Sequence, residues 1–186
     1  DHSQTTGSID DPIHNIGRDD VDSLGATLQL GFKPILLSDN WSLKLSGGLD
    51  HYLDLVRSYA WRVYNDVDIT RQQSRGQYVD GSWHQMGGAY LEQTTRYKKT
   101  LFFRAGVRSG WQWIHSPEDT ESDTAAVDGH SLPIAGHGGI EWRITPAFHL
   151  LATFDHSHRS PNINDLTARQ QTGPGFQYEN PNLKAE

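Results

Sequence analysis

Apolar and polar residues alternate along most of the chain, which is the pattern of β-strands with two different faces. The alternation is clear where Leu101 and Phe103 interleave with Arg104 and Arg108. Six strands are predicted in this way, at residues 21–33, 41–65, 83–97, 100–115, 132–145 and 148–160, and the C-terminal residues are predicted to begin a seventh. The fold class is therefore expected to be all-β and antiparallel, and the polar residues 1–20 are expected to form a loop.

The predicted strand at residues 41–65 is unusually long. Leu43, Leu49 and Leu53 mark one face, and Lys44 and Asp50 mark the other. Strands in globular proteins commonly have about 3–10 residues, whereas a tilted strand crosses a bilayer with about 9–11. A strand that crosses a membrane and continues beyond it explains the length.

The connections between the predicted strands alternate in length. Short turns are expected at residues 34–40, 98–99 and 146–147, and long polar loops at residues 66–82, 116–131 and 161–180. Outer-membrane barrels are connected in this way, by short periplasmic turns and longer extracellular loops. The pattern predicts a segment of a large transmembrane β-barrel whose long loops lie outside the cell.

Aromatic residues gather at two levels of these strands, as the aromatic girdles of a barrel do at the two membrane interfaces. The level near the short turns contains Phe32, Trp41, Tyr97, Phe103 and Phe148. The level near the long loops contains Tyr59, Trp61, Trp83, Trp111 and Trp113.

The polar faces of the predicted strands carry charges of both signs. These charged residues are Asp50, Asp54, Arg104, Arg108, Glu141 and Arg143. Charges in a soluble core need complete pairing, whereas those in a barrel interior meet water, a plug or each other. The polar face is therefore predicted to line the lumen, and the apolar face to meet lipid.

Composition agrees with this picture and excludes some partners. Apolar residues make up 35% of the 186 residues, and no run approaches the roughly 20 apolar residues of a membrane-spanning helix. The net charge of −7 and the lack of a basic stripe argue against nucleic acid as a partner. Alternation alone does not identify the solvent, so a soluble β-sheet binding module remains an alternative at this point.

No catalytic, cofactor or metal motif is present, and the chain is not expected to be an enzyme. His156 and His158 lie two residues apart beside Asp155, a spacing that can share a metal, but rim histidines are the favoured interpretation. The loop acids at 118–128 lack the order of a calcium loop and are interpreted as solvated. The residues that contact a ligand cannot be predicted.

Two stretches near the C-terminus carry a family resemblance. The first is Phe-Asp-His-Ser-His-Arg-Ser-Pro-Asn-Ile-Asn-Asp-Leu (154–166), and the second is Asn-Pro-Asn-Leu-Lys-Ala-Glu (180–186). They resemble the F-R-A-P-N-L-x-E-L and N-P-N-L-K-P-E wording of TonB-dependent outer-membrane receptors. The chain departs from that wording at Ser160, Asp165 and Ala185, where the family usually has Ala, Glu and Pro. The matched residues fill the last fifth of the chain.

The resemblance implies a 22-stranded barrel filled by an N-terminal plug. Such receptors sit in outer-membrane lipid, bind a scarce solute (a ferric siderophore, vitamin or glycan) at the outer face, and receive energy from the TonB complex. A general porin, which lacks a plug, is the alternative within membranes.

The whole chain, residues 1–186, is expected to be part of such a barrel domain and a fragment of the receptor, without plug, TonB box or signal peptide. Asn162, Asn164 and Asn182 are expected to cap backbone groups in the last loop.

Overall fold

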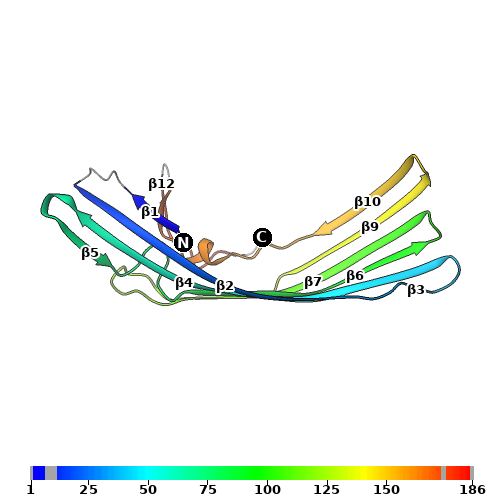
Figure 1. Ribbon diagram of the computed structural model, residues 1–186, viewed down its shortest axis with the longest axis horizontal. Helices are drawn as coiled ribbons and strands as arrows, with labels where there is room; N and C mark the ends of the chain where they lie inside the picture. The colour runs from blue at the N-terminus through cyan, green and yellow to red at the C-terminus, as the bar shows by residue number, and fades with distance from the viewer. Residues whose placement is uncertain (1, 7–11, 173–174, 185–186) are drawn as a thin grey trace.

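The computed structural model describes residues 2–6, 12–172 and 175–184. Most of these residues form one large antiparallel sheet that curves strongly into a trough (Figure 1). Neighbouring strands follow the order β1-β2-β4-β6-β7-β9-β10. The six long strands are β2 (Ile13–Gly31), β4 (Trp41–Tyr64), β6 (Trp83–Tyr97), β7 (Leu101–Ser116), β9 (Ile134–Thr145) and β10 (Phe148–His156).

Smaller elements extend the ends of this sheet or lie beside it. The short strands β1 (His2–Thr6), β3 (Ile35–Leu36), β5 (Ile69–Gln73) and β8 (Val127–Ser131) pair with its long strands. A separate hairpin of β11 (Gln170–Thr172) and β12 (Gly175–Gln177) follows the helix α1 (Ile163–Thr167), and the 3-10 turn η1 (Asn65–Val67) follows β4.

The predicted all-β antiparallel fold of six long strands is confirmed. The β6–β7 and β9–β10 turns and β3 lie at one end of the trough, with β1, β5 and the long loops at or near the other (Figure 1). The 24-residue length of β4 also confirms the unusually long strand.

The prediction that residues 1–20 form a loop is wrong for residues 2–6 and 13–20, and residues 1 and 7–11 lie outside the described residues. Strand β2 already begins at Ile13, and its register with β4 runs without a break from Ile13–Tyr64 to Gly31–Ser46. Residues 2–6 form β1, which pairs with β2. The sequence signal failed because both faces of these strand ends carry polar residues, so alternation disappears while the backbone pairing continues.

The three predicted long loops contain more regular structure than expected. Strand β5 extends the ladder of β4, and β8 extends that of β7. The third loop contains α1 and the β11–β12 hairpin. Strand β10 ends at His156, earlier than predicted, and the C-terminal turn is present at Asn180–Leu183. The predicted seventh strand does not begin among the described residues after this turn, and residues 185 and 186 lie outside the described residues.

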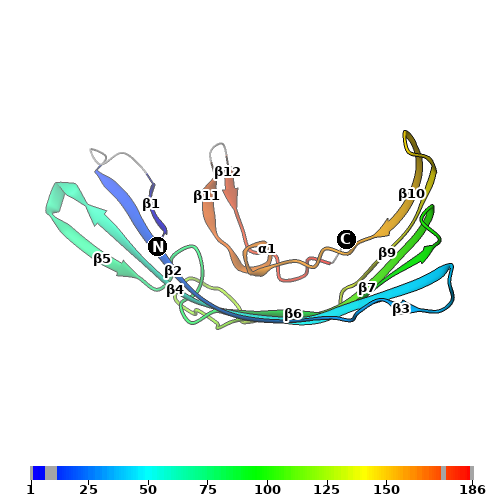
Figure 2. The same cartoon turned by 45° about the vertical axis from the view of Figure 1, so that its right-hand side comes forward.

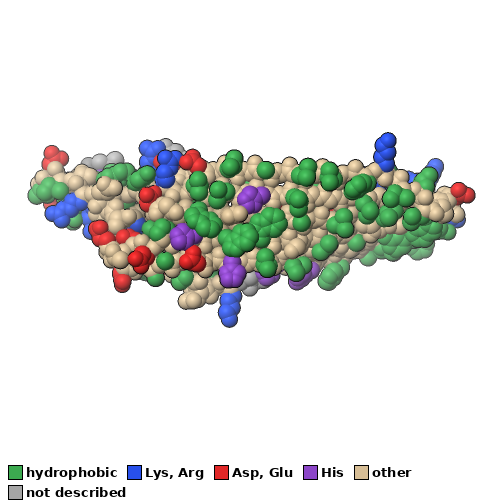
Figure 3. All heavy atoms as spheres, turned by 90° about the horizontal axis from the view of Figure 1, so that it is seen from below, with side chains coloured by type: hydrophobic (Ala, Val, Ile, Leu, Met, Phe, Trp, Pro, Cys, Tyr) green, Lys and Arg blue, Asp and Glu red, His purple; other side chains and the backbone are tan. Residues whose placement is uncertain are grey.

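The two faces of the sheet differ as predicted. Figure 3 views the convex side, where apolar side chains spread over the central and right-hand parts of the sheet. Exposed apolar residues with the register of this face include Leu28, Leu30, Leu49, Leu91, Val107, Ile134, Trp142, Leu150 and Phe154. The largest apolar patch on a typical soluble monomer covers about 300–600 Å². A continuous apolar face over so many strands therefore calls for an apolar solvent or a partner.

Long side chains on the concave face lie over glycines of the neighbouring strand. A Cβ added at Gly88 would lie 2.7 Å from Arg108 Nη2, and one at Gly106 would lie 2.4 Å from His137 Cε1. The same relation places Tyr52 over Gly25. The glycines thus let large polar side chains lie flat against the wall.

None of the helices among the described residues is long and apolar enough to cross a membrane.

Candidate functional site

The long loops meet on the concave side of the sheet, where α1 and the β11–β12 hairpin lie inside the trough (Figure 2). A small apolar cluster fixes α1 there, because Leu166 packs with Ile114 of β7 and Val127 of β8. Ile163 packs against the edge of this cluster. The last loop therefore turns inward over the trough instead of extending away from the strand ends.

Helix α1 begins with a reciprocal cap. The side chain of Asn162 accepts a hydrogen bond from the Asp165 backbone N–H (2.9 Å), and the Asp165 carboxylate accepts one from the Asn162 N–H (3.0 Å). Such a capping box satisfies two otherwise unpaired backbone donors. The predicted capping role of Asn162 is confirmed. Asn164 acts differently, since its side-chain oxygen accepts hydrogen bonds from Gln77 and Tyr78 of another loop.

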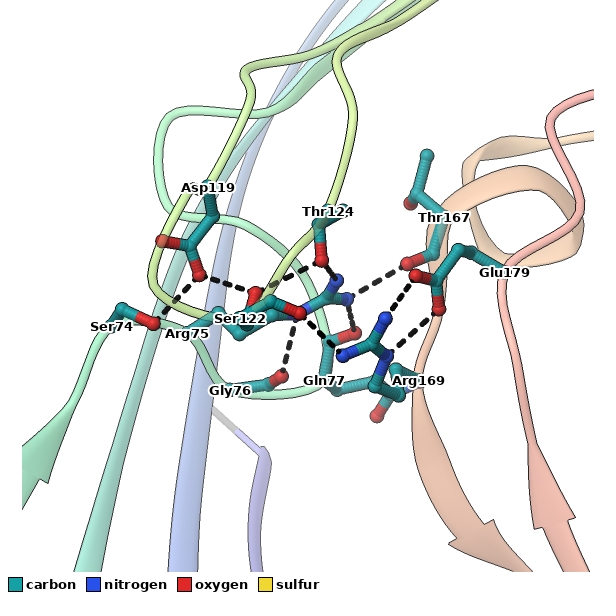
Figure 4. Close-up of polar contacts among 10 residues, drawn as sticks. All are labelled: Ser74, Arg75, Gly76, Gln77, Asp119, Ser122, Thr124, Thr167, Arg169 and Glu179. Carbon is teal, nitrogen blue, oxygen red and sulfur yellow. Dashed lines mark hydrogen bonds and ion pairs between the residues drawn. The ribbon is translucent and has the colours of Figure 1, made fainter.

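Arg75 is the side chain that ties the loops together (Figure 4). It is only 7% exposed, and its guanidinium donates to Thr124 Oγ1 (2.8 Å), to the Gln77 carbonyl (2.9 Å) and to the Thr167 carbonyl (2.9 Å). Burial lowers the pKa of Arg75, and the charge of Glu179 acts in the opposite direction. The planar guanidinium suits this task because it offers five donors in a fixed arrangement.

Asp119 organises the second loop. Its carboxylate accepts hydrogen bonds from Ser74 Oγ (2.7 Å) and Ser122 Oγ (2.5 Å), and its backbone forms two hydrogen bonds with Thr124. Burial alone would raise the pKa of Asp119, but the serine hydrogen bonds and the nearby Arg75 charge outweigh it and lower that pKa. The charged form of Asp119 is therefore part of the folded loop.

Arg169 joins the β11–β12 segment to the same assembly. Its Nε donates to Glu179 Oε2 (2.9 Å), a second nitrogen donates to Glu179 Oε1, and Nη1 donates to the Ser122 carbonyl (3.0 Å). Burial would raise the pKa of Glu179, but the hydrogen bonds from Arg169 lower it overall. Three loops are thus held by two arginines.

A cavity of about 370 Å³ lies between this loop assembly and the inner wall of β2 and β4. Its lining includes Arg62, Gln73, Arg75, Glu121 and Phe176. The hydrogen bonds of Arg75 and Arg169 go to protein acceptors, so both residues shape the cavity wall. This cavity at the loop end of the wall, lined by both polar and apolar surface, is the candidate functional site.

Away from the loop assembly, the concave wall carries ion pairs between strands. Arg108 of β7 binds both carboxylate oxygens of Asp50 on β4, at 2.7 Å each. Glu141 of β9 accepts from Arg104 (3.1 Å) and Arg143 (2.7 Å). The predicted lumen charges therefore share one face, and in these pairs they are matched across or along the strands.

The curved antiparallel sheet and its charged concave face agree with the protein family that the chain matches. The chain matches the family described as TonB dependent receptor-like, beta-barrel over residues 1–186. This chain belongs to that family. TonB-dependent receptors are receptors and transporters, not enzymes, in agreement with the prediction from the sequence.

One solved TonB-dependent receptor is similar in fold. It is a double mutant of the Serratia marcescens hemophore receptor HasR in complex with its hemophore HasA and heme. The TM-score is 0.60 at 14% sequence identity, and the match covers 93% of this chain and 28% of the HasR chain. The chain thus spans about a quarter of the receptor that it matches. A search of curated proteins finds no significant match.

The other candidate residues of this receptor wall can now be placed. Strand β10 ends at His156 and His158 lies beyond it, so the strand does not hold the two imidazoles on one face, as a shared metal site would need. Asp128 binds His115 (2.7 Å), and no group of three or more metal-ligating side chains converges within the described residues. Asn180, not Asn182, provides the side-chain cap, accepting from the Asn182 backbone N–H (3.2 Å).

The lowered pKa values of two loop carboxyl groups predict how the loop assembly of this receptor responds to pH. Because the folded pKa values of Asp119 and Glu179 are lowered, their contribution to stability is complete at neutral pH. It is lost as the pH falls from about 4, the pKa of an unfolded carboxyl, through the lower folded values. Amide protection factors of residues 117–126, corrected for intrinsic exchange rates, are expected to be constant from about pH 7 to 5 and to fall below about pH 4.

The matched variants are Asp119→Asn and Glu118→Gln, since Glu118 is exposed. Asp119→Asn is expected to lower protection at neutral pH and to flatten the acid response, and Glu118→Gln to change neither. An unchanged acid response in Asp119→Asn would show that this carboxylate does not stabilise the loop.

Proposed function

We propose that this chain forms part of the barrel wall and outer loops of an outer-membrane receptor that takes up a scarce solute with energy from TonB. The match to the TonB-dependent receptor family over the whole chain carries the proposal. The apolar convex face and the charged concave face fit a wall between lipid and lumen. The same family match favours a receptor over a general porin or a soluble binding module.

The solute class proposed for the receptor is a metal chelate, with a vitamin or glycan as the alternatives. The HasR structure contains heme, which is a property of that protein and supports an iron chelate here by fold similarity alone. Binding is proposed to begin in the cavity beneath the loop assembly. Its volume of about 370 Å³ falls within the roughly 300–1,000 Å³ of small-molecule sites.

The partners in this proposal are outer-membrane lipid on the convex face and a plug domain in the trough. The plug would connect the receptor to TonB. Residues 1–186 would then be part of the barrel domain, with the plug encoded elsewhere in the same receptor.

Site-specific labelling tests the orientation in the outer membrane. A cysteine placed at Ala126, which is exposed in the second loop, is expected to react with a membrane-impermeant reagent on intact cells. A cysteine at Lys99, in the short β6–β7 turn, is expected to react only after lysis. Gln77 is less suitable because it binds Tyr78 and Asn164. The reverse labelling pattern would contradict the orientation.

Uptake assays test the receptor function itself. Cells whose growth depends on one iron chelate are supplied with the receptor, and growth is compared with and without a functional TonB. Growth that requires both the receptor and TonB supports the proposal. Growth that requires the receptor but not TonB would favour the porin alternative.

A further inference from the structure

Two short connections meet at the end of the trough that lies away from the loop assembly (Figure 1). The first, residues 32–40, closes through a hydrogen bond from the Leu37 N–H to the Trp41 carbonyl (2.9 Å). The second is the β6–β7 turn, where the Lys98 N–H donates to the Asn40 carbonyl (2.6 Å). The backbone thus ties the two turns into one rim, to which the proposed function gives no role.

A cavity of about 260 Å³, which we call the rim pocket, lies between these turns. Three cationic side chains line it, Arg96, Lys98 and Lys99, together with one acid, Asp39. None of the three cations forms an ion pair within the part of the chain that the structure describes. The rim pocket is therefore positively charged in a chain whose net charge is −7.

Ser42 adds a buried hydroxyl to the rim pocket. It is only 7% exposed, and no hydrogen bond to this hydroxyl is found among the described residues. Buried polar groups nearly always have a partner. A ligand oxygen in the pocket would provide one, and a hydroxyl beside Arg96 and Lys99 is a donor set that suits phosphate.

The first turn exposes an unusual amount of apolar surface. Phe32, Ile35, Leu36 and Leu37 are all exposed, and Leu36, which is 76% exposed, also lines the rim pocket. A contiguous apolar surface of this kind marks an interaction site. Apolar side chains beside a cluster of cations are the combination by which a protein segment lies in a membrane interface.

Aromatic rings place the rim pocket at the level of the lipid headgroups. Trp41, which lines the pocket, packs against Tyr97 with 4.7 Å between ring centroids and against Phe103 with 6.3 Å. Such rings at the ends of lipid-facing strands lie at the membrane–water interface. A headgroup in the rim pocket would therefore have its acyl chains beside the apolar turn.

We propose that the rim pocket binds the phosphate of an anionic phospholipid, with the acyl chains along the apolar turn and the convex face. Arg96 and Lys99 pair with the phosphate, and the Ser42 hydroxyl donates to one of its oxygens. The apolar turn continues the apolar convex face, which favours a lipid over an acidic polypeptide segment as the occupant. The inference rests on the proposed function for its orientation, in which this rim meets the phospholipid of the periplasmic leaflet.

The test uses the complete receptor purified in a neutral detergent. Three probes are titrated and counted by native mass spectrometry: short-chain phosphatidylglycerol, phosphatidylcholine with the same chains, and inorganic phosphate. The variant combines Arg96→Gln with Lys99→Gln. Lys98 is kept because its backbone has a positive φ of 51° and ties the two turns.

The matched control combines Arg57→Gln with Arg71→Gln. It removes the same charge from exposed positions that do not line the rim pocket. Heat-modifiable migration on a gel shows whether each barrel is folded.

The Arg96→Gln and Lys99→Gln variant is expected to bind phosphatidylglycerol roughly 20-fold more weakly, about fivefold for each charge removed. The control is expected to bind it as the parent does. Phosphatidylcholine and inorganic phosphate are expected to bind the parent at least about tenfold more weakly than phosphatidylglycerol, since one lacks the net charge and the other the acyl chains.

A second variant, Leu36→Asn, keeps the proposal testable if the charge variant does not fold. It is expected to weaken phosphatidylglycerol binding and to leave phosphate binding unchanged. Equal phosphatidylglycerol affinity in a folded charge variant and the parent would overturn the proposal. Equal affinity of the parent for both lipids would do the same, and phosphate binding as tight as lipid binding would show a site for free anions.

The outcomes separate this inference from the receptor function, because the lipid titration needs neither solute nor TonB. A folded receptor that binds no phosphatidylglycerol but supports TonB-dependent growth would overturn the inference alone, in favour of an acidic polypeptide segment. A receptor that binds the lipid as expected, but whose growth never depends on TonB, would overturn the proposed function alone. Labelling of a cysteine at Lys99 on intact cells would overturn the orientation and with it the phospholipid source.

Discussion

Val107→Arg is expected to lower the free energy of unfolding of the complete barrel in lipid vesicles by roughly 2–4 kcal/mol, the cost of arginine on a lipid face near the bilayer midplane. Val107 is 52% exposed on the convex face, in the middle of β7. Its register partners are Leu91 on β6 and Gly136 on β9, so no neighbouring acid can pair with the new charge. Denaturant unfolding in vesicles measures the change.

The control must place arginine on the opposite face without steric conflict. Gly106 is unsuitable because His137 already occupies the space above it. Gln29 is exposed, and the alternation of β2 places it on the concave face. Gln29→Arg is expected to cost much less than Val107→Arg. If the two variants lose equal stability, the convex face does not meet lipid.

Arg75→Met is expected to lower the free energy of local opening of the outer loops by on the order of 3 kcal/mol, while the barrel strands stay folded. The change removes the donors to Gln77 and Thr167, and each buried carbonyl left without a partner costs about 1–3 kcal/mol. Hydrogen exchange followed by mass spectrometry is expected to show faster exchange in residues 74–82 and 161–170.

Arg62→Met is the matched control for this loop variant. Arg62 also lines the cavity, but it is exposed, and its Nε donates a hydrogen bond to Asn15 Oδ1 (3.1 Å). It is expected to leave loop exchange unchanged. Equal exchange in the Arg75→Met variant and the parent would show that the hydrogen bonds of Arg75 do not hold the loops together. Slower binding of the solute is a further expected effect of Arg75→Met, since a disordered loop must be ordered on binding.

Much of the barrel wall could be predicted from the order of residues. Alternation depends only on each strand having one apolar and one polar side, and such a signal is local. It therefore located six strands, the three short turns and the two faces, including the positions of Arg104 and Val107. The family wording near Asn162 and Asn182 added the barrel type, which periodicity cannot supply.

The strand ends could not be predicted in the same way. Around Asp19 both faces of β2 are polar, so the backbone ladder continues without an alternating pattern. Only pairing with a neighbouring strand shows that β2 begins at Ile13. The same reason explains why β5 and β8 were placed in loops, since five-residue strands at the end of a ladder depend on a partner strand for their stability.

The loop assembly was decided by tertiary structure. Arg75 contacts Thr124 and Thr167, which lie 49 and 92 residues away in the chain, and no local pattern marks such a contact. The sequence by itself determined the strands, their faces and the family. The inward turn of the last loop and the hydrogen bonds of Arg75 and Arg169 arise from long-range packing and pairing, which only the folded chain brings together.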